Sequence, residues 1–262
     1  MHGSSPERPP GSPETPGALG AADVHVWLLE APEDAPPARV ERCAALLDAG
    51  ERARMGRFHA AADARRYLFA HALARTTLTR YAPETPPAGW RFRTNEHGRP
   101  EIAGAVTPLR FNLSHTAGLV ACAVAHDRDV GVDVEHLHPP RWDAAASLEV
   151  AASHFAPAER AGLEAAGPEA RAARFFAIWT LKEAYIKARG LGLSLPLARF
   201  AFELDAGPEP RDRFDAGFGD EPEAWHFACL RPTPAHALAL AVRRAHGETL
   251  AVRVCPALAD SP

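Results

Sequence analysis

The sequence predicts an α+β fold, and three features of its apolar pattern support this class. Short apolar segments separated by tight turns follow one another between residues 109 and 135, which favours antiparallel strands. Helical periodicity extends over 63–81 and again over 171–189. Four more short strands are expected after the second helix, at 199–204, 223–230, 236–243 and 249–254. Helices and strands grouped in this way indicate an α+β protein.

The first part of the chain begins with a segment, 1–22, that is rich in Pro, Gly, Ser and Ala and is expected to be a flexible tail. Large apolar residues recur at helical spacing through 63–81, and Pro83 ends that helix. The other elements expected before residue 109 are a strand at 24–28, a helix at 39–47, a strand at 90–93 and a turn at 95–100.

Three strands are expected at the centre of the chain, at 109–113, 119–125 and 130–135, with a turn at 114–118 that contains Ser114 and His115. Beyond the second long helix, the loop 205–222 is rich in Gly, Pro and Asp. The expected division is a tail at 1–22, an N-terminal half at 23–130, a C-terminal half at 131–255 and a tail at 256–262.

The composition excludes several classes of protein. The chain has 262 residues, of which 47% are hydrophobic and 24% charged, as in globular proteins. A formal charge of −4 argues against a dedicated nucleic-acid binder. The four cysteines are far apart, which argues against a zinc ribbon or a disulfide scaffold. No apolar signal segment or run of ~20 apolar residues is present, so we expect a cytoplasmic protein that does not enter the membrane.

The pentapeptide GVDVE at 131–135 is the sharpest local signal. If it forms a strand, Asp133 and Glu135 share one face, about 6.6 Å apart along the backbone. Two carboxylates so placed can bind one hard cation such as Mg²⁺. The alternative is the polar outer face of a half-exposed strand, which the alternation alone also predicts.

The second signal is FFAIWTLKEAYIK at 175–187. On a helix, Glu183 and Lys187 share a face with Phe176 and Trp179, which indicates a partly enclosed site for both charges. A metal ion and a phosphate would supply the partners that buried charges need. Alternatively, the two residues form an ordinary pair one turn apart on a helix surface.

Five arginines lie within fifteen residues near the first long helix. They form either a solvated helix face or a local anion site. Arg99, Ser114 and His115 are candidates to add hydrogen-bond donors from nearby loops, although His115 alone is as easily a packing residue. The five arginines are Arg52, Arg54, Arg57, Arg65 and Arg66.

Taken together, these motifs resemble the 4′-phosphopantetheinyl transferase superfamily, and most closely its surfactin-type members. The pairing of G-x-D-x-E with W-x-x-K-E-x-x-x-K, in this order and spacing, is highly specific. FNLSHTAGLVACAVA, NEHGRPEI and RFHAAADARRYLFAHALAR extend the resemblance over roughly 24–245. It implies two similar α/β halves related by a pseudo-twofold axis, with mainly antiparallel sheets and coenzyme A in the cleft between them.

The resemblance also implies a reaction and its residues. The phosphopantetheine arm of coenzyme A passes to a serine of an apo acyl or peptidyl carrier protein, and adenosine 3′,5′-bisphosphate is released. Asp133, Glu135 and Glu183 correspond to Mg²⁺ ligands, Lys187 to the pyrophosphate-binding lysine and His115 to the histidine beside the same phosphates. The attacking hydroxyl belongs to the carrier, so the chain needs no nucleophile of its own, and Glu183 is the candidate to accept the serine proton.

At the nucleotide, Arg54 and Arg66 fall where the family has basic residues for the 3′-phosphate. Arg99 falls at the basic turn position, and Ser114 precedes the phosphate-contacting histidine. Glu51 departs from the pattern, because surfactin-type members often carry a basic residue there.

Several alternatives remain open at this stage. An acidic cluster with a lysine also serves Mg²⁺-dependent nucleases and phosphoesterases, and a non-catalytic coenzyme A sensor is a third possibility. The size favours carriers of secondary metabolism, from polyketide synthases or nonribosomal peptide synthetases, and a monomer is expected by analogy. The segment 138–165 forms either a docking surface for the carrier or part of the core, through Trp142, Leu148, Val150, Phe155 and Leu163.

Overall fold

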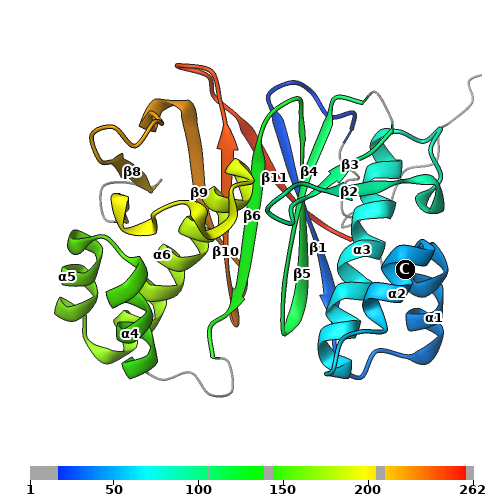
Figure 1. The fold of residues 1–262 in the computed structure, drawn as a ribbon, viewed down its shortest axis with the longest axis horizontal. Coiled ribbons are helices and arrows are strands. Elements are labelled where there is room, and N and C mark those ends of the chain that lie inside the picture. The colour runs from blue at the N-terminus through cyan, green and yellow to red at the C-terminus, as the bar shows by residue number, and fades with distance from the viewer. Residues whose placement is uncertain (1–16, 105–106, 139–143, 205–209, 258–262) are drawn as a thin grey trace, which may run out of the picture.

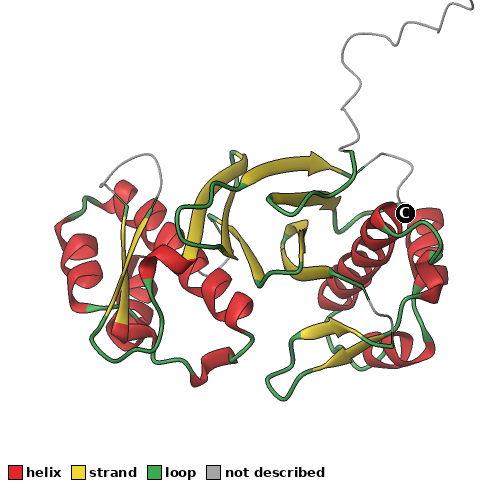
Figure 2. Cartoon of the chain, turned by 90° about the horizontal axis from the view of Figure 1, so that it is seen from above, coloured by secondary structure: helices red, strands yellow, loops and turns green. Residues whose placement is uncertain are grey.

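The computed structural model describes residues 17–104, 107–138, 144–204 and 210–257, without the side chains of 144, 169 and 193. The strands lie at the centre of the molecule, with one group of helices on each side (Figure 1). Figure 2, from above, shows the helices at the two ends and the main strands between them. The predicted α+β class with mainly antiparallel sheets is confirmed.

The N-terminal half is built on a sheet with the strand order β11-β1-β5-β4. Neighbouring strands are antiparallel except β1 and β11, which are parallel. The sequence places the last strand in the C-terminal half, whereas the structure pairs it with the first strand of the N-terminal sheet. The strands are β1 (Asp23–Ala31), β4 (Leu109–Thr116), β5 (Gly118–His126) and β11 (Ala251–Pro256).

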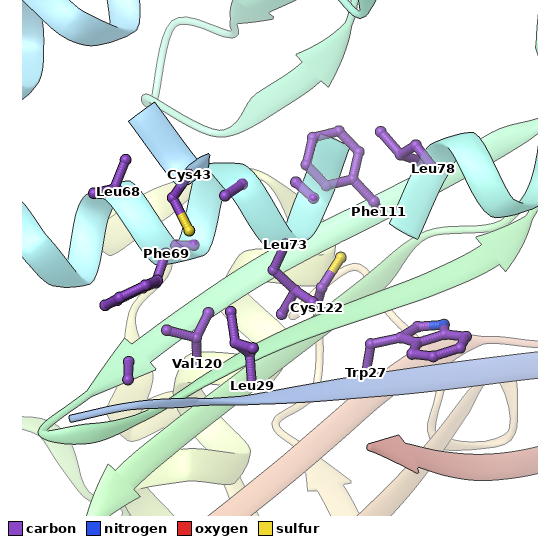
Figure 3. Close-up of a cluster of buried hydrophobic side chains, with 14 of the residues drawn as sticks. Trp27, Leu29, Cys43, Leu68, Phe69, Leu73, Leu78, Phe111, Val120 and Cys122 are labelled. Carbon is purple, nitrogen blue, oxygen red and sulfur yellow. The ribbon is translucent and has the colours of Figure 1, made fainter. Parts of the chain in front are cut away.

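The longest helix of this half, α3, covers the sheet, and α1 and α2 pack against α3. Leu73 and Leu78 of α3 pack against Phe111, Cys122 and Trp27 of the strands (Figure 3). These side chains are almost completely removed from water, which is the main stabilisation of this half. The helices are α1 (Pro37–Leu46), α2 (Ala49–Met55) and α3 (Ala61–Tyr81); a 3₁₀ turn, η1 (Pro87–Gly89), and a hairpin of β2 (Phe92–Thr94) and β3 (Pro100–Ile102) follow.

The C-terminal half has the same plan, an antiparallel sheet covered by a long helix. The sheet has the order β6-β10-β9, and α6 packs on it through Tyr185 and Leu181. Pro168 begins α6, and Gly190 ends it with a left-handed conformation at φ +65°. The sheet strands are β6 (Val130–His136), β9 (Trp225–Thr233) and β10 (His236–Arg243); the helices are α4 (Ala144–His154), α5 (Pro157–Ala165) and α6 (Pro168–Arg189). Smaller elements are η2 (Gly192–Ser194), η3 (Leu197–Arg199), β7 (Phe200–Glu203), β8 (Arg211–Phe214) and η4 (Pro222–Ala224).

Side chains of β4 join the two sheets. Three backbone amides of β6 donate to three side-chain oxygens of β4, in place of a main-chain ladder between these strands. The pairs are Val132 to Asn112 at 2.9 Å, Val134 to Ser114 at 3.1 Å and His136 to Thr116 at 3.2 Å. The prediction of a turn at 114–118 was therefore wrong for its first three residues, because the polar side chains that suggested a turn accept hydrogen bonds from the neighbouring strand.

Other differences from the sequence-based expectations concern short elements. The helices α2, α4 and α5 were not predicted, and β8 lies within the segment 205–222 that was expected to be a loop. The end of the predicted tail is also held in place, since the Ala22 carbonyl accepts from the Ala251 amide and the Ala21 carbonyl accepts from Arg128. Among the residues described, no helix is both long and apolar enough to cross a membrane.

Candidate active site

Gly131 explains how closely strand β6 approaches helix α6. A Cβ atom at this position would lie 2.0 Å from the carbonyl oxygen of Ala184 and 2.4 Å from the amide nitrogen of Ala188. A larger residue would therefore push the helix away from the strand. The contact brings Asp133 and Glu135, which share one face of β6, to the helix that carries the second acidic motif.

Asp133 is at the centre of the acidic end of the site and is only 4% exposed. Its Oδ1 lies 2.6 Å from the Nζ of Lys187 and accepts from the Ser114 hydroxyl at 2.9 Å. Lys187 also donates to the Ser114 oxygen at 3.0 Å. The other carboxylate oxygen, Oδ2, is buried and has no hydrogen-bond partner among the residues described. One oxygen of Asp133 is therefore free to accept a further ligand.

Glu135 and Glu183 lie beside Asp133 and feel its charge. Burial and the neighbouring Asp133 raise the pKa of Glu135 to about 7, against the opposing effects of Lys187 and a hydrogen bond with Trp179. Burial and Asp133 also raise the pKa of Glu183, although Lys187 opposes the shift. Both carboxyls therefore lack sufficient positive charge in their surroundings.

This set of donors fits a hard divalent cation. Three carboxylates share one cavity with a single lysine, Lys187, and carboxylate oxygens are the ligands that Mg²⁺ prefers. In the described part of the chain, no three acidic, histidine or cysteine side chains already have the spacing of a metal site. The acidic end thus offers the ligands for an ion, and Lys187 is the cation next to Asp133 in the structure.

The acidic end belongs to a cavity of about 860 Å³ that both halves of the chain line, as expected for a cleft between two halves. Asp133, Glu135, Trp179, Glu183 and Lys187 of the C-terminal half line one side. The N-terminal half contributes Asp48, Gly50, Glu51, Arg54, Arg57, Tyr67, Ala70, His71, Phe92, Arg93, Thr94, Gly98, Pro100, Leu113, Ser114 and His115. Positive side chains on this second side complement the negative ones on the first.

His115 lies on β4 next to Ser114, and both line the cavity. Removal from bulk water lowers the pKa of His115, and the positive charges of Lys187 and Arg66 lower it further. These neighbours favour a neutral imidazole, which can donate one hydrogen bond to a ligand. The sequence motif NLSH therefore places a polar pair beside the acidic cluster.

The predicted nucleotide-binding arginines lie in different surroundings. Arg54 lines the cavity, with its guanidinium 5.9 Å from the centre of the Tyr67 ring. Arg66 is paired with Asp63 on the same helix and is not among the described residues that line the large cavity. Its charge nevertheless acts on His115.

Arg99 lines two smaller cavities of about 280 and 400 Å³ beside the large one. Its guanidinium donates to the backbone carbonyls of Ala188 at 2.6 Å and Val130 at 3.5 Å. Asn95, in the same turn, donates to the Gly190 carbonyl at 2.8 Å. The turn that contains Arg99 therefore holds the end of α6 against the N-terminal half.

Two groups of residues at the cavity escaped the sequence analysis. Gly131 was quoted within its motif, but only the structure shows why a glycine stands there. His71 and Arg75 of α3 form a cluster with Asp48 and Glu51 that includes ion pairs of 2.7 to 3.2 Å. Nothing in the helical periodicity distinguishes these two residues from solvent-exposed ones, so the sequence alone offered no signal for them.

The segment 138–165 contributes to the core of the C-terminal half. Phe155 and Leu163 are 1% and 0% exposed, and Leu148 and Val150 pack against the same cluster. The core alternative is therefore confirmed for these four residues, while Trp142 lies outside the described residues.

Comparisons with known proteins relate the chain to one family of enzymes. The sequence model described as 4′-phosphopantetheinyl transferase superfamily matches residues 129–242, and another, described as 4′-phosphopantetheinyl transferase, N-terminal, matches residues 35–127. A 4′-phosphopantetheinyl transferase of Bacillus subtilis is 34% identical over 164 residues, which are 63% of this chain and 69% of that protein. The 4′-phosphopantetheinyl transferase HetI of Nostoc sp. is 32% identical over 227 residues, 78% of this chain and 92% of HetI.

Proposed function

Because the chain belongs to the 4′-phosphopantetheinyl transferase superfamily, we propose that its large cavity binds coenzyme A between the two halves, with the diphosphate at the acidic end. The enzyme transfers phosphopantetheine from coenzyme A to carrier proteins, as membership of the family implies. The observation that supports this placement is the meeting of Asp133, Glu135, Glu183 and Lys187 in one cavity that also holds basic residues.

Asp133, Glu135 and Glu183 are the residues that would hold Mg²⁺. The buried, unpartnered Oδ2 of Asp133 and the raised pKa of Glu135 both indicate that this end lacks a positive charge. When bound, Mg²⁺ supplies positive charge that stabilises the phosphoryl oxygens during transfer. Binding of the ion would also favour the ionised form of all three carboxyls.

Lys187 and His115 also act on the diphosphate at this end of the cavity. Lys187 is held by Asp133 and Ser114, so its ammonium group is positioned before the substrate arrives. A preorganised charge of this kind stabilises the negative charge that develops on the departing nucleotide. His115, as a neutral donor, adds a hydrogen bond to the same oxygens.

The reaction forms one bond and breaks one bond at phosphorus. The carrier serine oxygen attacks the β-phosphorus of coenzyme A, and the bond to the oxygen of adenosine 3′,5′-bisphosphate breaks. The serine proton goes to Glu183, directly or through water, because this carboxyl faces the same cavity. The leaving phosphate departs as an anion beside Lys187.

Arg54 and Arg66 are proposed to contact the 3′-phosphate of the coenzyme, and Arg99 to lie near its nucleotide. We propose carriers of polyketide or peptide synthesis as partners, and a cytoplasmic monomer as the working form. A panel of apo carriers of the three types, fatty-acid, polyketide and peptide, distinguishes between these partners by relative rate.

The mass of an apo acyl carrier protein tests the activity. Incubation with coenzyme A, Mg²⁺ and the enzyme is expected to add about 340 Da to the carrier. Asp133→Ala and Glu183→Ala are expected to abolish the addition, and Lys187→Ala to slow it roughly 10²–10³-fold, because each removes a preorganised charge. Glu84→Gln, a change at an exposed acidic residue outside the cavity lining, is the matched control and is expected to keep the wild-type rate. Wild-type rates in Asp133→Ala or Glu183→Ala would contradict the metal assignment, and cleavage of nucleic acid in place of the addition would favour a nuclease.

A further inference from the structure

The N-terminal side of the cavity contains a charged cluster that the reaction does not use. Arg75 is completely buried, and it donates to Asp48 at 3.2 Å and to Glu51 at 2.8 and 3.0 Å. Its remaining donors go to the carbonyls of Pro87 at 2.9 Å and Trp90 at 3.0 Å. Arg75 is thus occupied by the protein and has no donor left for a ligand.

Glu51 is occupied in the same way. One of its oxygens accepts from Arg75 and from the Asp48 amide, and the other accepts from the Nδ1 of His71 at 2.7 Å. Burial alone would raise the pKa of Glu51, but the hydrogen bonds from His71 and the Asp48 amide and the nearby charges lower it. Glu51 is therefore an ionised carboxylate with both oxygens satisfied, although it stands where the family often has a basic residue.

His71 is the member of the cluster that can reach a ligand. Because an ionised carboxylate only accepts, the Nδ1 of His71 carries the hydrogen that it donates to Glu51. The ring lies 4.0 Å from the Tyr67 ring, centre to centre, and lines the cavity. Among the residues described, its Nε2 has no hydrogen-bond partner. Protonated at Nε2, His71 presents one charged donor toward the cavity.

The cluster contains two carboxylates, Asp48 and Glu51, and one permanent cation, Arg75. Arg75 balances one of the two carboxylates, Asp48 and Glu51, and an imidazolium at His71 balances the other. Arg54 and Arg57, which line the same part of the cavity, then give the site a positive charge. Such a site suits a phosphate dianion.

On the basis of the proposed function, we propose that His71, held by Glu51, donates to the 3′-phosphate of coenzyme A and makes the enzyme prefer coenzyme A to 3′-dephospho-coenzyme A. Coenzyme A has two phosphate-bearing groups, the diphosphate and the 3′-phosphate. Lys187 and His115 lie at the acidic end, where the diphosphate is placed. Of the other basic residues that line the cavity, Arg93 pairs with Glu101, and His71, Arg54 and Arg57 are left for the 3′-phosphate. His71, oriented by Glu51, thereby supplies a charged donor in place of a basic residue at position 51.

A comparison of two substrates with three variants tests this role. For each protein, KM and kcat are measured with coenzyme A and with 3′-dephospho-coenzyme A, at saturating apo carrier. His71→Ala is expected to raise KM for coenzyme A about tenfold or more, as for loss of one charge-assisted hydrogen bond. KM for the dephosphorylated substrate should change less than about twofold, because the partner of His71 is absent from it. Glu51→Gln, which keeps the shape but loses the charge, should reduce the preference by an intermediate factor.

His59→Ala is the matched control, since His59 is exposed and outside the cavity lining. It should keep the wild-type preference. Calorimetric titration with adenosine 3′,5′-bisphosphate and adenosine 5′-monophosphate should show the same loss of discrimination in His71→Ala without any turnover. An equal effect of His71→Ala on both substrates, or none on either, would overturn the role of His71 while leaving the transferase activity intact. If the wild type transfers from neither substrate, the proposed function itself fails, and the inference fails with it.

Discussion

The two halves of the molecule contain a similar buried ion pair, and the side chains around the pair differ. In each half a short helix precedes a long one, α2 before α3 and α5 before α6. A glutamate in the first turn of the short helix accepts a hydrogen bond from the backbone amide three residues earlier. These bonds are Asp48 to Glu51 at 2.9 Å and Ala156 to Glu159 at 2.8 Å.

A completely buried cation on the long helix pairs with that glutamate in both halves. Arg75 lies 2.8 Å from Glu51, and Lys182 lies 2.8 Å from Glu159. Each cation also donates to two backbone carbonyls of the segment that follows its helix. The acceptors are Pro87 and Trp90 for Arg75, and Leu197 and Phe200 for Lys182.

The difference lies four residues before each cation. In α3 this residue is His71, which contacts Glu51 and lines the cavity. In α6 it is Ile178, which is 0% exposed and packs in the core. The cluster of Lys182 and Glu159 is therefore enclosed in the core, and we call it the closed cluster. The cluster of Asp48, Glu51, His71 and Arg75 borders the cavity, and we call it the open cluster.

The largest expected effect on stability comes from the closed cluster. Lys182→Met leaves the Glu159 carboxylate buried without its cation, which should lower the free energy of unfolding by about 3–5 kcal/mol. Lys182→Met combined with Glu159→Gln removes both charges, but the glutamine keeps only one of the two oxygens that accept from the Ala156 and Phe202 amides, so part of the loss should be recovered. Urea denaturation of the three proteins measures both effects.

The corresponding pair of substitutions in the open cluster measures the same recovery for the N-terminal half. Arg75→Met alone should also lower the free energy of unfolding. Adding Glu51→Gln should recover a smaller share of that loss than in the closed cluster, because Asp48 still lacks its partner Arg75. Equal recovery in both halves would show that the two clusters do not differ in the way described.

A smaller effect is expected from the opposite pKa shifts of the two glutamates. The pKa of Glu51 is lowered. Its contribution to stability is therefore present at pH values above the ordinary pKa of a glutamate, and it is lost as the pH falls through the lowered pKa. Burial raises the pKa of Glu159, so its contribution is present at low pH and is lost as the pH rises through the raised value.

When the pH is lowered from about 6.5 to 3.5, the difference in the free energy of unfolding between wild type and Glu51→Gln should therefore shrink. The difference between wild type and Glu159→Gln should grow. Each change should be on the order of 1 kcal/mol. Denaturation curves at several pH values measure this. Changes of the same sign in both variants would contradict the assigned shifts.

The sequence predicted the acidic end of the cavity because local patterns control it. Alternation along β6 placed Asp133 and Glu135 on one face, and helical spacing placed Glu183 and Lys187 one turn apart on α6. Their meeting also depends on Gly131, whose missing side chain allows strand and helix backbones to touch. That contact joins residues more than fifty positions apart, so no local pattern reveals it.

The buried cations could not be predicted for a related reason. A lysine or arginine in a helix is normally exposed, and periodicity gives no sign that Arg75 and Lys182 are buried. Their partners, Glu51 and Glu159, lie more than twenty residues earlier, on short helices that the periodicity also failed to reveal. Ser114 was assigned to a turn because its acceptor role toward β6 depends on how the two sheets meet.

Three carboxylates from β6 and α6 are proposed to bind one divalent cation beside the diphosphate of coenzyme A. Calorimetric titration of Mg²⁺ into the enzyme with bound coenzyme A measures this directly. The wild type should bind Mg²⁺ at a single site that Asp133→Asn removes or weakens by at least about tenfold, with Glu84→Gln unchanged. Equal Mg²⁺ affinity in the wild type and Asp133→Asn would contradict the account.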